Sequence, residues 1–158
     1  MRRRYALLLA TLLLLPTAAS AVTVLNATLT GLAEVPPNAS PAVGNATVTL
    51  DNAGTTISWS VTYSGLLGTL TASHIHSAPI GTNGPVIIAL NPVSGTTSGS
   101  YSGSAPVTPA QASDLLAGLD YINIHSNLYP GGEIRGQLTT GVTPAARGTW
   151  GRIKTLYH

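Results

Sequence analysis

Three of the four histidines of this 158-residue chain fall in two short alternating segments, which are therefore the first place to look for chemistry. His74 and His76 flank Ile75, and His125 ends the segment 121–125, in which isoleucine again alternates with polar side chains. Successive side chains of a β-strand point to opposite faces, so His74 and His76 share one face. If the two segments are neighbouring strands, the three imidazoles can meet on the outer face, opposite the isoleucines.

Three imidazoles on one face predict a site for a divalent transition metal. Imidazole is a common ligand of copper, zinc and iron, and His74 and His76 at i and i+2 of one strand can share an ion. His125 would complete a three-nitrogen set that leaves a position open for water or another ligand. Because the chain has no cysteine, thiolate ligands are absent and copper or zinc is the expected ion. The alternative interpretation is structural: the same histidines could hydrogen-bond to loop carbonyls and fix the loop at residues 77–84.

Three further polar side chains are candidates to support the histidines. Asn123 lies on the same face of its segment as His125. Glu133 and Arg135 stand at i and i+2 of the last alternating segment and therefore share a face. Each could orient a histidine through a hydrogen bond, as residues around a metal ligand commonly do, and Glu133 and Arg135 could instead form an ion pair with a neighbour. For Glu133 and Arg135, a lone pair of opposite charges, the structural role is favoured.

The sequence shows no pattern of catalytic residues. It has no nucleophile elbow, phosphate loop or spaced carboxylate pair, and the side chains of Ser126 and His125 point apart if both lie on one strand. Nucleic-acid binding is excluded, because Arg135 is the only positive side chain between Val22 and Leu138 and such binding needs a basic stripe. The residues favour a non-catalytic structural or interaction module, with extracytoplasmic copper or zinc binding as the alternative. No motif identifies a particular protein or cell-surface partner.

The first residues have the composition of an export signal. Three arginines at positions 2–4 precede an apolar run at 5–15, and small residues occupy positions 19–21. This pattern predicts a secretory signal peptide over residues 1–21, cleaved before Val22. The apolar run is shorter than the roughly 20 residues that a membrane-spanning helix needs, which makes a retained anchor the weaker alternative. The mature chain is expected to be secreted or periplasmic, with no transmembrane span.

The last residues also differ from the middle of the chain. Residues 141–158 begin with a linker-like Gly-Val-Thr-Pro stretch and continue with Trp150, Ile153 and Leu156 among basic residues. A helix would gather these apolar side chains on one side, and a frayed tail is the alternative. A single domain is therefore expected between the two ends, at residues 22–140.

The period of the apolar residues predicts an all-β domain. Apolar and polar side chains alternate in several short runs that are separated by turn residues. Helical spacing occurs only near residues 109–117, where Thr108 is a capping residue before Pro109. Many short strands and one short helix predict an antiparallel Greek-key β-sandwich over residues 23–138. The core should bury Ile75, Ile122 and Ile124, with Trp59 beside them or across the sheet.

Several motifs, taken together and in order, resemble the CHRD domain, which was named from chordin and is widespread in exported bacterial proteins. They are Glu34-Val35-Pro36-Pro37, His74-Ile75-His76, Asn83-Gly84-Pro85-Val86, and the segments 121–125 and 132–137. The resemblance covers residues 23–138 and implies an extracellular β-sandwich without supplying a biochemical activity. In chordin itself, growth-factor binding is usually credited to separate cysteine-rich modules, and this chain has no cysteine.

The His-x-His strand in a Greek-key fold is also similar to copper–zinc superoxide dismutase, and implies a sandwich of that kind. That family needs more histidines than His74, His76 and His125, an aspartate shared with zinc, and a disulfide. The similarity therefore concerns the fold, and dismutase activity is not expected.

Overall fold

The computed structural model describes residues 22–141, which form nine strands, one short 3-10 helix and one α-helix. The elements are β1 (Thr23–Thr30), η1 (Gly31–Ala33), β2 (Val43–Leu50), β3 (Thr56–Ser64), β4 (Leu70–Ser77), β5 (Val86–Ala89), β6 (Gly99–Pro106), α1 (Pro109–Leu116), β7 (Asp120–Ser126), β8 (Ile134–Gln137) and β9 (Thr139–Thr140). The predicted signal peptide, and the predicted tail from residue 142 onward, lie outside the described residues.

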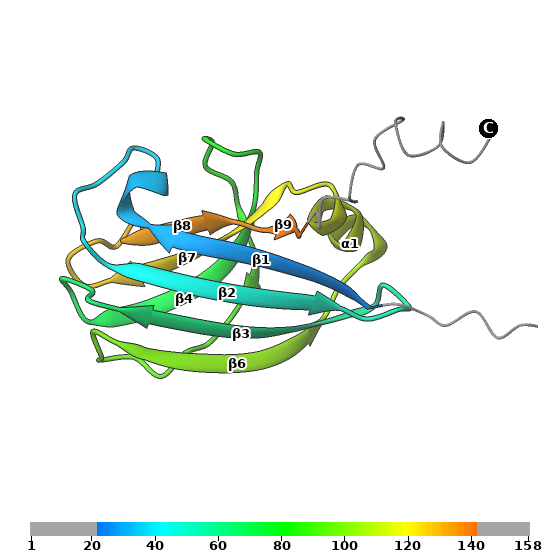
Figure 1. The fold of residues 1–158 in the computed structure, drawn as a ribbon, viewed down its shortest axis with the longest axis horizontal. Helices are drawn as coiled ribbons and strands as arrows, with labels where there is room; N and C mark the ends of the chain where they lie inside the picture. Colours follow the sequence, from blue (N-terminus) through cyan, green and yellow to red (C-terminus); the bar gives the residue numbers. More distant parts are fainter. Residues whose placement is uncertain (1–21, 142–158) are drawn as a thin grey trace, which may run out of the picture.

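The strands form one antiparallel sheet in the order β5-β4-β7-β8-β1-β2-β3-β6, and β9 pairs with β1. The sheet curves back on itself like a nearly closed barrel, so that β4, β7 and β8 lie behind β1, β2, β3 and β6 (Figure 1). β8 meets β1 at a single registered pair, Thr30 with Arg135. The predicted antiparallel all-β fold with one short helix is confirmed, and its two layers belong to one continuous sheet.

The alternating runs bury one face and expose the other. Along β3, buried and exposed residues alternate strictly, because one face packs in the core and the other meets solvent. Ile75, Ile122 and Ile124 have no exposed surface, and Trp59 belongs to the same core cluster, as predicted. Every residue of β7 is buried, however, which means that both faces of this strand are covered. The face of β7 that points away from the core carries the candidate site.

The α-helix begins where its sequence predicts. Thr108 and Gln111 form a reciprocal capping box: the Thr108 hydroxyl accepts from the amide of Gln111, and the Gln111 side chain accepts from the amide of Thr108. Ala112 and Leu115 pack into the core. Within residues 22–141, no helix is long and apolar enough to cross a membrane.

Candidate metal centre

The three histidines come together because their strands are neighbours. β4 and β7 pair antiparallel, with Ala72 opposite His125 and His74 opposite Asn123. This register places His74, His76 and His125 on the same face, away from the isoleucines. The three side chains each offer one ring nitrogen to a common group, in which no two of these nitrogens lie more than 4.8 Å apart. The convergence expected from the spacing is therefore present in the structure.

His76 has one ring nitrogen fixed and the other without a partner. Its Nδ1 lies 2.9 Å from the carbonyl oxygen of Gly84. A carbonyl can only accept, so Nδ1 carries the hydrogen and Nε2 carries the lone pair. Nε2 is buried and has no hydrogen-bond partner among the described residues. The side chain thus presents a buried lone pair to the other two histidines.

His125 is held in the same way. Its Nδ1 donates to the carbonyl oxygen of Pro130 at 3.0 Å, which leaves the lone pair on Nε2. That Nε2 lies 3.2 Å from Nδ1 of His74, so without a metal it accepts the Nδ1–H of His74. His74 is partly exposed, whereas His76 and His125 are each only 9% exposed. The site is on the outer face of the sheet, as predicted, but loops cover most of it.

The spacing of the nitrogens fits a metal ion. Zinc–nitrogen bonds of 2.0–2.1 Å in a tetrahedral site place two ligand nitrogens roughly 3.3–3.5 Å apart. The 3.2 Å between His74 and His125 already matches this separation. The remaining distances are at most 4.8 Å, so shifts of about 1.5 Å or less among the three rings would bring the nitrogens to this separation. Donation of the second ring N–H to a backbone carbonyl is the arrangement that usually orients a ligating histidine.

Gly84 connects the loop between β4 and β5 to this site. Its carbonyl oxygen accepts from His76, and its amide donates to the Tyr121 hydroxyl at 3.1 Å. A Cβ on residue 84 would stand 1.9 Å from the backbone oxygen of Ser77, so only glycine fits here. The structural interpretation of His76 is therefore also realised, because this side chain fixes the loop at residues 77–84 through one of its two nitrogens.

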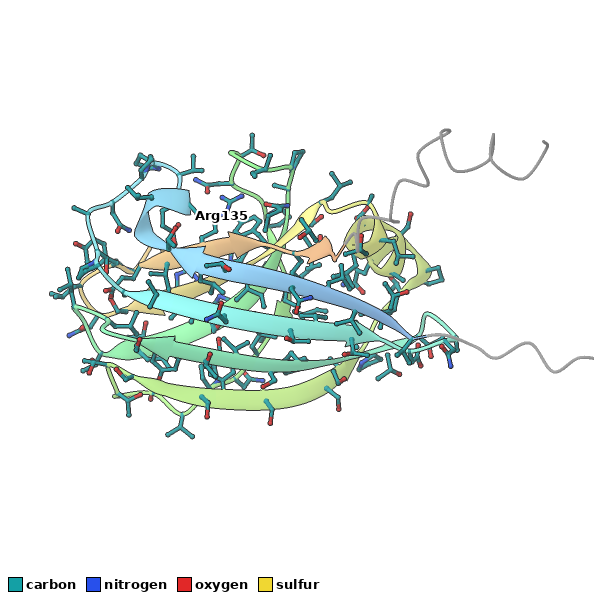
Figure 2. The ribbon with its side chains drawn as sticks, in the orientation of Figure 1. Arg135 is labelled. Atoms are coloured by element: carbon teal, nitrogen blue, oxygen red, sulfur yellow. The ribbon has the colours of Figure 1, made fainter. Side chains whose placement is uncertain are left out.

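Arg135 supports the site from behind His76. Its guanidinium carbon lies 3.4 Å from the centre of the Tyr121 ring, and that ring stacks on His76 with centroids 5.0 Å apart. The guanidinium also donates to the Thr82 carbonyl at 2.7 Å and to the Asn83 side chain at 3.1 Å. Figure 2 labels Arg135 where η1, β8 and the loop after β4 come together. Its influence on the histidines is thus indirect, through Tyr121 and the loop.

Glu133 is a structural residue rather than a partner of the histidines. It is fully buried, and its carboxylate accepts from the Ser40 hydroxyl at 2.7 Å and from the backbone amides of Leu67 and Gly68. Burial raises the pKa of Glu133, but hydrogen bonds from the Ser126 hydroxyl and from these groups lower it more, so the net pKa falls below its usual value. Within the described chain, no hydrogen bond joins Glu133 to an imidazole.

Asn123 lies on the histidine face but bonds elsewhere. Its amide nitrogen donates to the Glu34 carboxyl at 3.4 Å and to the carbonyl of Gly131 at 3.5 Å. The groups that do orient the histidines are the carbonyls of Gly84 and Pro130, together with the ring of Tyr121. A carbonyl has no signature in the sequence. The place of Gly84 in the Asn83-Gly84-Pro85-Val86 motif was the available signal for the first of them.

The surroundings favour the neutral form of the imidazoles. Burial lowers the pKa of His74 below its ordinary value of 6.5, and the neighbouring His76 lowers it further. Burial also lowers the pKa of His125; its bond to Pro130 opposes this effect, and His74 and His76 add to it. Neutral imidazole is the form that ligates a metal.

Comparison with known proteins agrees with the motifs. The chain matches the family model described as the CHRD domain over residues 25–138. No curated protein and no solved structure matches the chain, so no structural neighbour supports the similarity to copper–zinc superoxide dismutase. The matched segment runs from β1 to the residue after β8 and includes all three histidines. The chain therefore belongs to the CHRD domain family.

Proposed function

We propose that this CHRD-domain protein binds one divalent transition metal ion, copper or zinc, through Nδ1 of His74 and Nε2 of His76 and His125. One observation carries the proposal: Nε2 of His76 is buried beside two other imidazoles and has no hydrogen-bond partner within residues 22–141. A buried polar atom left unsatisfied costs about 1–3 kcal/mol. A metal ion shared with His74 and His125 would satisfy it.

The donor set selects among metals. It consists of three neutral imidazoles, and the acidic side chains of this end of the molecule, Glu34 and Glu133, are not members of the histidine group. Ions that prefer oxygen ligands, such as magnesium and calcium, are disfavoured by such a set. Copper(II) heads the usual affinity order for nitrogen sites, ahead of zinc. Three protein ligands would leave a coordination position open for water or an external ligand.

The second candidate is a non-catalytic structural or interaction module. The hydrogen bonds of His76 to Gly84 and of His125 to Pro130 favour it, because they fix two loops without any metal. Calorimetric titration of the purified protein with copper and with zinc separates the two candidates. Metal binding predicts one ion bound per chain, whereas the module alone predicts no saturable heat.

The protein is expected to act outside the cytoplasm. The arginines at positions 2–4, the apolar run at 5–15 and the small residues at 19–21 support export and cleavage before Val22. N-terminal sequencing of the protein from culture supernatant or periplasm should begin at Val22. Protein that retains Met1 and stays in the cytoplasm would contradict both the predicted export and the predicted location outside the cytoplasm.

Metal binding should persist to a lower pH than an ordinary histidine site allows. The lowered pKa values of His74 and His125 keep these rings neutral below pH 6.5, and a bound metal competes with protons further. Half of the copper binding should therefore be lost at a pH below 6.5, in titrations repeated between pH 5 and 8. A half-loss at pH 7 or above would show that at least one ring is easily protonated and contradict this account.

A further inference from the structure

A second buried polar group lies at the same end of the molecule, between the segment after η1 and the loop after β7. It consists of Glu34 and Asn123, which are 5% and 3% exposed. The amide nitrogen of Asn123 donates to Oε2 of Glu34 at 3.4 Å. The other oxygens of the two groups, Oε1 of Glu34 and Oδ1 of Asn123, are both buried and have no hydrogen-bond partner among the described residues.

The two unpartnered oxygens both adjoin the space that a side chain on Gly132 would occupy. A Cβ built on Gly132 would stand 2.5 Å from Oδ1 of Asn123 and 2.7 Å from Oε1 of Glu34, so both oxygens adjoin the same point. If Glu34 were ionised, a carboxylate oxygen would be buried beside a carbonyl oxygen with no hydrogen between them. Two acceptors in that arrangement repel each other, and each remains unsatisfied. A single proton on the Glu34 carboxyl would remove the repulsion and give both oxygens a hydrogen-bond partner.

We infer that Glu34 and Asn123 form an acid–amide pair that binds one proton at neutral pH. Oε1–H of Glu34 donates to Oδ1 of Asn123, and Nδ2–H of Asn123 donates to Oε2 of Glu34. The second hydrogen on Nδ2 of Asn123 is directed to the carbonyl of Gly131. The pair is thus fully satisfied only when the proton is present.

The charges around the pair are consistent with this assignment. Burial raises the pKa of Glu34 to about 7; Arg135 and the hydrogen bonds from Asn123 and the Val35 backbone oppose the rise without cancelling it. Arg135 on β8 is the charged group that acts on Glu34. The other titratable groups packed here are His74 and His76 on β4, Asp120, Tyr121 and His125 on β7, Tyr129 in the loop after β7, and Glu133, whose carboxylate is bonded to Ser40, Leu67 and Gly68.

The proton would hold two segments together. Glu34 belongs to the segment that follows η1, and Asn123 also bonds to Gly131 in the loop after β7. Loss of the proton places two acceptors face to face, so the 34–38 segment should then be held to the 127–132 loop more weakly, by the bonds of Asn38 to the carbonyls of Gly132 and Glu133. The pair therefore acts as a pH-sensitive latch, closed below about pH 7. It does not depend on a metal at the histidines, so it stands even if the proposed function fails.

The composition of the chain allows a direct test, because Glu34 and Glu133 are its only glutamates. Protein labelled with ¹³C at the glutamate carboxyl carbon should give two signals in metal-free buffer. One should titrate near pH 7 and be missing in Glu34→Gln; the other, from Glu133, should titrate below 4.5. A Glu34 signal that titrates at or below 4.5 would overturn the proposal. Thermal stability alone is a poorer readout, because burial also raises the pKa of Asp120, to about 6.

A second measurement tests the latch itself. Glutamine at position 34 can form the same two bonds to Asn123 without a titrating proton, so Glu34→Gln should behave as a permanently closed latch. Exchange of the backbone amides of Tyr129, Gly131 and Gly132 should accelerate in the wild type relative to Glu34→Gln as pH rises from 6 to 8.5. The ordinary increase of the exchange rate with pH is common to both proteins, so it cancels when the wild-type rate is divided by the Glu34→Gln rate at each pH. A ratio that stays constant across this range would contradict the latch.

Discussion

Replacing His76 with alanine should weaken copper or zinc binding by at least about 100-fold. Even partners that only orient a ligand typically contribute 10–100-fold to metal affinity, and His76 would be a ligand itself. In the wild type, metal at about 100 times the dissociation constant should stabilise the fold by about 2.7 kcal/mol. The same metal concentration should leave the melting temperature of His76→Ala nearly unchanged. Calorimetry and thermal melts with and without metal measure both effects.

A matched control shows that the loss is specific to the site. Ser60→Ala removes a polar side chain from the exposed face of β3, on the other half of the sheet, and should bind metal as the wild type does. His76 also bonds to Gly84, so His76→Ala can destabilise the fold without any metal. The melting temperatures of His76→Ala and the wild type are therefore first compared in metal-free buffer. Equal metal affinity in His76→Ala and the wild type would remove His76 from the site.

Replacing Gly84 with alanine should destabilise the fold by about 2–6 kcal/mol. The new Cβ would stand 1.9 Å from the backbone oxygen of Ser77, so the loop must move. Such overpacking typically costs about 1–3 kcal/mol, and the bonds to His76 and Tyr121 would be lost with it, at about 0.5–1.5 kcal/mol each. Denaturant unfolding measures the change. Metal affinity should fall too, because His76 loses the carbonyl that orients it.

Gly131→Ala is the matched control for this prediction. A Cβ on Gly131 meets no atom within 4 Å, and this residue lies in the other loop beside the histidines. Its unfolding free energy should stay within about 0.5 kcal/mol of the wild type, as for most surface substitutions. Equal stability of Gly84→Ala and Gly131→Ala would mean that the loop at residues 77–84 accommodates the new Cβ without cost. It would then not be rigid enough to orient His76.

The sequence predicts the parts of this molecule that depend on local pattern. Alternation of apolar and polar side chains places Ile75 and Ile122 in the core and the histidines on the opposite face. Thr108 and Pro109 mark the start of the single α-helix. These features depend on side-chain direction along one segment, which a short stretch of sequence already determines.

The groups that orient the histidines depend instead on contacts between distant segments. Arg135 reaches His76 only indirectly, through the Tyr121 ring and the loop after β4, and Pro130 contributes only its carbonyl oxygen. Glu133 was a candidate partner of the histidines, but it bonds to Ser40 and to backbone amides near Gly68. Such pairings are set by how loops fold over the sheet, and neither spacing nor residue type specifies them.

The central claim is that one metal ion binds between the three imidazoles. Anomalous diffraction from a crystal of the protein grown with copper tests it most directly. The account predicts one strong peak per chain, about 2.0–2.1 Å from Nδ1 of His74 and from Nε2 of His76 and His125. An ordered site with the three rings in place and no anomalous peak between them, at saturating copper, would contradict it.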